Sequence, residues 1–260
     1  TVDIARMMSY QRKNVLATID SKILEKNVPK HLRSSDGTWF ALSKRARVVA
    51  ISKERVKQSE IRRIEDLTSA EWKGRVCSRP GSHVYNRSLL ASIIAANGAD
   101  DATKWAKGLV LNLARRPQGN DRAQIKAIHS GECDVALVNH YYYGKLLFSK
   151  MPSQRSWANS VNLVFTNQND RGNHVNISGG GVAKYSKNKL NAIKFLEYLS
   201  TKEAQDIYAS LNYEFPVNTR SELNDLVKKW GTFKEDEIPV ERLGKLQRDA
   251  VKLAQEAEYF

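Results

Sequence analysis

Short apolar runs of β type alternate with longer helical patterns along the whole of this 260-residue chain. One run ends at the Pro80-Gly81 turn and another covers Cys133–Val138, and a helical pattern follows each of them. This alternation is typical of βα units, so the sequence predicts an α/β fold. The chain is long enough to form two domains, because single hydrophobic cores stop growing at about 250–300 residues.

The composition is that of a folded and strongly basic protein. Hydrophobic residues make up 41% of the chain and charged residues 27%, which is an ordinary balance for a globular domain. The 42 Lys and Arg outnumber the 28 Asp and Glu and leave a net charge of +14. Such a surface attracts nucleic acid, anionic lipid or cell-wall polymer. No apolar stretch reaches the ~18 residues of a transmembrane span, and Thr1–Arg6 lack the pattern of a secretory signal.

The sequence does not favour an enzyme. It contains no GxxxxGK[ST] phosphate loop, no HExxH metal motif and no GxSxG nucleophile turn. The two cysteines have neither CxxC nor Cys/His spacing, which argues against a zinc or iron–sulfur site. The five histidines are scattered along the chain, and we interpret them as surface or packing residues: His31, His83, His129, His140 and His174.

The cysteines and tyrosines keep matching intervals. Tyr85 lies eight residues after Cys77, and Tyr141 lies eight residues after Cys133. Ligands of open α/β sheets bind beyond the carboxyl ends of the strands, so two adjacent strands of this kind would bring Tyr85, Tyr141 and Tyr142 to one cleft. The same adjacency would place the cysteines within bonding distance, if their Cβ atoms face one another.

A group of phenols can bind a highly charged cation. A phenol has a pKa of about 10, but a trivalent ion stabilises the phenolate, so a proton is lost on binding. Hard oxygen donors suit a hard ion and favour ferric over ferrous iron. Arg45 or Arg47 could balance part of the phenolate charge. The alternative is that the run Tyr141–Tyr143 packs as ordinary aromatics at a strand end and that Tyr85 is a half-buried residue of a first helical turn.

Five segments carry a more specific resemblance, and together they extend over nearly the whole chain. They are TWFALSKRARV at 38–48, GRVCSRPGSHVYNRS at 74–88, LARRPQGNDRAQIKAI at 113–128, GECDVALVNHYYYGK at 131–145 and NISGGGVAK at 176–184. They resemble the cyanobacterial branch of the ferric-ion-binding periplasmic proteins.

The resemblance implies a two-lobed periplasmic binding protein fold with hinge strands. The first lobe would comprise residues 1–65 and 171–222, and the second lobe residues 66–170 and 223–260. Such proteins close on Fe(III) between the lobes and deliver it to an inner-membrane ABC permease. Members of the family begin with a strand and a loop that supply a further ligand. Nothing similar stands before Thr1, so we expect the first lobe to be incomplete and that ligand to be missing.

The resemblance also implies roles for particular residues. Tyr85 of SHVYN and Tyr141 and Tyr142 of NHYYYG would bind the ferric ion, and Tyr143 would be their neighbour. Arg45 of KRARV would be the cation beside the phenolates. The implied periplasm is oxidising, and with the matched intervals it predicts a disulfide between Cys77 and Cys133. We expect a periplasmic monomer that catalyses nothing.

A basic nucleic-acid-binding protein is the alternative function. Five Trp and ten Tyr could stack on bases, with Lys and Arg contacting phosphates. The basic residues are scattered, however, and no RNA-binding signature is present, so no specific nucleic acid is expected as a partner. Oligonucleotide binding that persists after the tyrosines become Phe, without ferric affinity, would favour this alternative.

Overall fold

The computed structural model describes residues 2–260, and its longest element is the strand β2 (Trp39–Ser52). Every residue of β2 except Lys44 is buried, which is expected of a strand covered on both faces. The segment forms one continuous strand of 14 residues. Its first part belongs to unit 1 and its second part, from Ala46 onward, to unit 2.

These two units are the compact parts into which the chain divides. Unit 1 comprises the described part of Thr1–Arg45 together with Val175–Gly231 and Glu237–Lys245; unit 2 comprises Ala46–His174, Thr232–Asp236 and Leu246–Phe260. The lobe boundaries expected from the sequence differ from these. Residues 46–65 fall in unit 2, because the second part of β2 pairs with strands of that unit. The assignment of residue ranges to functional lobes stays a prediction.

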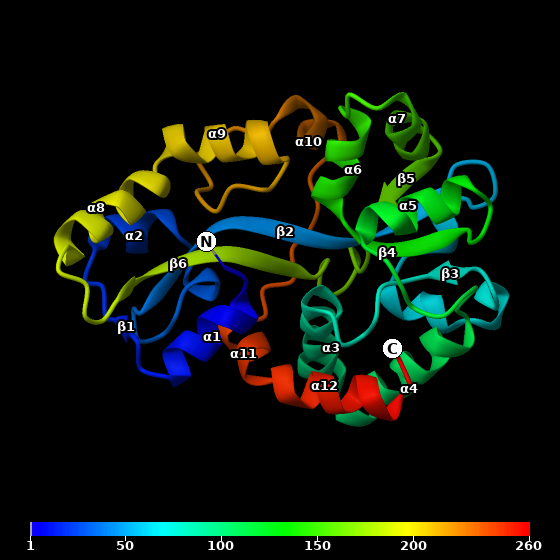
Figure 1. Cartoon of the computed structure of the whole chain (residues 1–260), viewed down its shortest axis with the longest axis horizontal. Helices are drawn as coiled ribbons and strands as arrows, with labels where there is room; N and C mark the ends of the chain where they lie inside the picture. The colour runs from blue at the N-terminus through cyan, green and yellow to red at the C-terminus, as the bar shows by residue number, and fades with distance from the viewer. Residues whose placement is uncertain (1) are drawn as a thin grey trace. The chain divides into compact units, whose positions relative to one another are not determined.

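Unit 1 packs helices on strands around one apolar core. The core includes Trp39 and Phe40 of β2 and Ile177 of β6. In Figure 1, α8 lies above the strands, while α1 and α11 lie below them. Besides the first part of β2, the elements are α1 (Ile4–Arg12), β1 (Leu16–Ala17), α2 (Lys22–Asn27), the short 3₁₀ helix η1 (Lys30–Leu32), β6 (Val175–Ala183), α8 (Lys189–Leu199), α9 (Lys202–Asn212), α10 (Asp225–Lys229) and α11 (Val240–Lys245).

Unit 2 is built on the second part of β2 and the strands that pair antiparallel with it. Its strand β4 pairs antiparallel with β2 and parallel with β3, and helix α12 packs against α3 and α4 (Figure 1). Its elements are η2 (Gln58–Glu60), η3 (Ile64–Thr68), η4 (Ala70–Trp72), β3 (Val76–Cys77), α3 (Val84–Asn97), α4 (Ala99–Leu111), α5 (Asp121–His129), β4 (Val135–Asn139), α6 (His140–Leu147), α7 (Pro152–Asn159), β5 (Val161–Val164) and α12 (Gln247–Glu256). The predicted α/β class is confirmed, and the segment from Val240 to Glu256 forms two helices, α11 and α12.

The glycine run 179–181 lies within β6, which continues through it. Neighbouring elements approach its backbone closely. A Cβ atom on Gly181 would lie 2.6 Å from the backbone oxygen of Thr38, and one on Gly180 would lie 2.9 Å from Leu196 Cδ2. The absence of side chains therefore lets a neighbouring strand and helix α8 pack directly on the backbone of β6.

None of the helices within residues 2–260 combines the length and the hydropathy that crossing a membrane requires. We draw no further conclusion from this.

The predicted disulfide between Cys77 and Cys133 is present, with a Cα–Cα distance of 5.9 Å. It joins the parallel strands β3 and β4 close to the point where Cys77 pairs with Ala136. Both cysteines are buried. The bond therefore links the end of β3, which precedes Tyr85, to the residues just before β4, which precedes Tyr141.

Replacing both cysteines by Ala should lower the free energy of unfolding by about 4 kcal/mol, because the bond closes a loop of 56 residues and so restricts the unfolded chain. Urea unfolding of the variant and the oxidised parent measures this difference. A loss below about 1 kcal/mol would mean that the unfolded chain is not restricted by the bond.

Candidate tyrosine site

Each tyrosine of interest lies at the start of a helix that follows a buried strand. Tyr85 is the second residue of α3, and Tyr141 is the second residue of α6. Since β3 and β4 are parallel neighbours, their carboxyl ends lie at the same edge of the sheet and the two helices begin side by side. The sequence placed Tyr141 at the end of a strand, but β4 ends at Asn139 and the helix begins at once.

The predicted tyrosines Tyr85, Tyr141 and Tyr142 are brought together in unit 2. The hydroxyl oxygens of Tyr85 and Tyr141 lie 3.1 Å apart, within hydrogen-bond distance. The rings of Tyr141 and Tyr142 have centroids 4.4 Å apart and are tilted by 32°. Tyr143 follows two positions after Tyr141, which is about 200° around the helix axis, so it points to another side of α6.

Burial keeps Tyr141 and Tyr142 protonated in the absence of a cation. Burial raises the pKa of Tyr141, and hydrogen bonds from Tyr142 and Tyr85 raise it further. Burial also raises the pKa of Tyr142 above its usual value of 10.0. At neutral pH these phenols are therefore neutral unless a cation stabilises the phenolates.

Four cationic side chains lie over the rings of the cluster. Arg79 and Arg47 lie 5.2 Å and 5.9 Å from the ring centroid of Tyr85. The amine of Lys145 lies 5.2 Å from the ring centroid of Tyr141, and Arg122 lies 5.4 Å from that of Tyr142. These cations are attracted by the ring faces, and they would stabilise phenolates that form there.

A buried carboxylate holds two of these cations. Asp121 is completely buried and lies 3.0 Å from Arg47 and 3.2 Å from Arg79. Arg47 also donates to the side-chain oxygens of Asn139 at 3.2 Å and Asn86 at 2.6 Å. The backbone N–H of Asn139 donates to Asp121 at 2.8 Å. Strands β2 and β4 and helices α3 and α5 therefore meet at one hydrogen-bonded ion pair.

Only some of the charged residues around the tyrosines were predicted from the sequence. Arg45 and Arg47 were the candidates, and the resemblance implied Arg45. In the structure Arg45 belongs to unit 1, where its guanidinium donates to the backbone oxygen of Ile177, while Arg47 contacts the ring of Tyr85. The role predicted for Arg45 stays a prediction. Arg79 and Asp121 were missed, although Arg79 follows β3 by two residues and so stands at the same sheet edge as the tyrosines.

Histidine 83 caps the helix that carries Tyr85. His83 is the N-cap of α3, and its Nδ1 accepts from the backbone N–H of Tyr85 at 3.3 Å. Burial, followed by the charge of Arg79, lowers the pKa of His83 to about 4. His83 is therefore neutral at neutral pH and adds no positive charge beside the cluster.

The tyrosine oxygens are the best candidates for metal ligands. Within residues 2–260, no group of three or more His, Cys, Asp or Glu side chains is placed to hold a metal ion. Two oxygens bound about 2.1 Å from one octahedral ion at a right angle are about 3.0 Å apart. The 3.1 Å between the hydroxyls of Tyr85 and Tyr141 already matches that separation.

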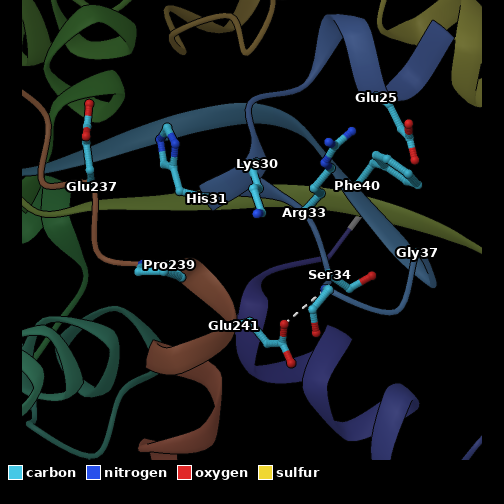
Figure 2. A pocket seen from close by; sticks show the side chains of 11 residues that line it. Glu25, Lys30, His31, Arg33, Ser34, Gly37, Phe40, Glu237, Pro239 and Glu241 are labelled. Carbon is cyan, nitrogen blue, oxygen red and sulfur yellow. Dashed lines mark hydrogen bonds between the residues drawn. The ribbon is translucent and has the colours of Figure 1, made fainter. Parts of the chain in front are cut away.

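Unit 1 contains a separate cavity of about 510 Å³, which none of the clustered tyrosines lines (Figure 2). Lys30 and Arg33 lie on its wall together with Glu25 and Glu237, so both signs of charge are present. Glu241, also on the wall, already accepts from the backbone N–H of Ser35 at 3.0 Å. This cavity offers no preference for a cation or an anion, and the tyrosine cluster is the stronger candidate site.

Comparison with known proteins gives consistent matches over the whole chain. Residues 2–234 match the model of the family described as bacterial extracellular solute-binding protein. The chain is 46% identical to iron uptake protein A1 of Synechocystis over 257 residues, which are 99% of this chain and 71% of that relative.

Two solved structures are also similar over the full length of this chain. A Trichodesmium protein, IdiA (FutA) in complex with iron and citrate, is 45% identical, with a TM-score of 0.98 and 82% of its chain covered. The apo ferric ion-binding protein A of Pasteurella haemolytica is also 45% identical, with a TM-score of 0.93 and 81% of its chain covered.

Replacing Asp121 by Asn should lower the free energy of unfolding by about 3 kcal/mol, because the buried Arg47 and the partly buried Arg79 would lose their counter-charge. Urea unfolding measures the loss. Asp101→Asn is the matched control, because Asp101 is 61% exposed and pairs with Lys104 at the surface, so it should cost less than about 1 kcal/mol. Equal losses in the two variants would contradict the special role of Asp121.

Proposed function

Because this chain belongs to the family of bacterial extracellular solute-binding proteins, we propose that its solute is a ferric ion held by Tyr85, Tyr141 and Tyr142. The observation that carries the proposal is the 3.1 Å separation of the Tyr85 and Tyr141 hydroxyl oxygens, with the ring of Tyr142 packed beside them. These oxygens come from two helices that begin at one sheet edge. They need little rearrangement to become neighbouring ligands of one cation.

The charges around the cluster fit an ion of charge three. Three phenolates balance Fe(III), and as hard anionic donors they favour ferric over ferrous iron. Without the ion, burial disfavours the phenolates of Tyr141 and Tyr142. With it, the ion and the cations Arg47, Arg79 and Lys145 together stabilise them. The site would therefore exchange protons for iron, and Tyr141 and Tyr142 would be protonated when it is empty.

The relatives support a role in uptake. The Synechocystis relative is an iron uptake protein, and the Trichodesmium structure contains iron and citrate. We infer that this chain delivers iron to an ABC-type permease from the periplasm, and that it acts as a monomer without catalysing a reaction. The buried Cys77–Cys133 disulfide supports an oxidising compartment of this kind.

Ferric citrate should give the protein a visible charge-transfer band, because phenolate oxygens bound to Fe(III) absorb visible light. Tyr141→Phe and Tyr142→Phe should each weaken ferric affinity by at least about tenfold and bleach or shift this band. Absorption titration of each variant measures both effects. Tyr143→Phe is the matched control on the same helix and should leave the band in place. Equal loss in all three variants would contradict the choice of ligands, and a colourless parent protein would contradict the function.

Ferric affinity should fall as the pH is lowered. The pKa of Tyr141 and Tyr142 is raised, so both are protonated when the site is empty, and each must release a proton when iron binds. Apparent affinity should therefore fall by about tenfold per pH unit for each tyrosine that binds. Competition with citrate between pH 6 and 8 gives the slope. Tyr142→Phe should reduce that slope by about one proton relative to Tyr143→Phe, since the chelator contributes equally to both; equal slopes would remove Tyr142 from the ligands.

A further inference from the structure

The C-terminus of the chain returns to the tyrosine site. Helix α12 ends at Glu256, and Glu258 has a left-handed backbone with φ of 55°, which turns the chain back on itself. Tyr259 is thereby directed into unit 2, where it is 1% exposed, while the next residue, Phe260, is 50% exposed.

Tyr259 packs on the turn that joins β3 to α3. The backbone N–H of Gly81 donates to the backbone oxygen of Tyr259 at 2.7 Å. A Cβ atom on Gly81 would lie 2.4 Å from the Tyr259 ring, so only glycine leaves room for the ring at this place. The hydroxyl of Tyr259 also hydrogen-bonds with that of Ser78. The turn between Cys77 and Tyr85 is therefore held at its centre by the last residues of the chain.

Asn86 links Tyr259 to Arg79 and Arg47 by hydrogen bonds. Its amide nitrogen donates to the Tyr259 hydroxyl at 3.0 Å and to the backbone oxygen of Arg79 at 2.8 Å. These bonds turn its amide oxygen toward Arg47, from which it accepts at 2.6 Å. Asn86 is 1% exposed and follows Tyr85 directly. A movement of Tyr259 would therefore change the places of Arg47, Arg79 and Tyr85 together.

We propose that Tyr259 is a positioning residue for cargo binding: its ring and backbone oxygen hold the 78–83 turn, and through Asn86 they fix Arg47 beside Tyr85. This inference rests on the proposed ferric function for its main measurement. The ring contributes most, because Asn86 keeps other acceptors when the hydroxyl is removed.

Ferric citrate titrations of the full chain test the proposal. Tyr259→Ala should weaken ferric affinity by about tenfold and shift the charge-transfer maximum, as expected when the support of a ligand is lost. Tyr259→Phe keeps the ring and should stay within about threefold of the parent. Phe260→Ala should match the parent. A folded Tyr259→Ala variant with unchanged affinity and band would overturn the proposal.

Two further variants separate positioning from a loss of stability. Val161→Ala removes buried contacts from β5 of the same unit and makes no contact in the Tyr259 network, so it should lower stability without changing the band. A band shift in Val161→Ala equal to that in Tyr259→Ala would overturn the proposal. Gly81→Ala displaces the ring from the other side and should reproduce the Tyr259→Ala effect, including when Tyr259→Ala does not fold. Parent-like binding by Gly81→Ala would overturn it.

A measurement on the iron-free protein tests the positioning role of Tyr259 independently of the proposed ferric function. A parent protein that binds no iron disproves the ferric function alone. The rate at which tetranitromethane nitrates Tyr85, followed by peptide mass spectrometry, then becomes the measurement. Tyr259→Ala should change this rate, because Arg47 and Arg79 move relative to Tyr85, and Phe260→Ala should not. Equal nitration rates of Tyr85 in the two variants would overturn the positioning role.

Discussion

The buried carboxylate of Asp121 is the interaction on which the tyrosine site depends. Two guanidinium groups, those of Arg47 and Arg79, lie beside it, and without it they would repel each other. Two features of the fold hold Asp121 in position. The capped N-terminus of α5 favours an acidic residue there, and the backbone N–H of Asn139 donates to it. One negative charge thus fixes a strand end, a helix start and two cations.

This arrangement places the charged groups of the site when the chain folds, before any ligand binds. The folded chain already contains the cations that phenolates require, and Asp121 offsets one of the two charges of Arg47 and Arg79. In the proposed function, ionisation of Tyr85, Tyr141 and Tyr142 on binding would need no new counter-charges. The arginines are also hydrogen-bonded from several directions, so they contribute a fixed field rather than mobile contacts.

Much of the fold and the tyrosine set was predictable from the sequence because both follow from local patterns. Apolar runs and matched intervals predicted the α/β class, the Cys77–Cys133 bond and the neighbourhood of Tyr85 and Tyr141, and the structure contains each of these. What was missed depends on contacts distant in sequence. No local pattern joins Asp121 to Arg47, and none directs Tyr259 to Gly81, since these pairs meet only through tertiary packing. The helix start at His140 was missed because buried strand and helix residues are equally apolar there.

The run of three tyrosines at the start of α6 also has a consequence for mutation by insertion or deletion. Each residue advances a helix by about 100°, so removing one residue before Tyr141 would bring Tyr142 and Tyr143 to the places that Tyr141 and Tyr142 now occupy. A phenol would still stand opposite Tyr85. Because Tyr143 is present, α6 would still offer two tyrosines at these places after deletion of one residue. A helix with only two tyrosines would offer one.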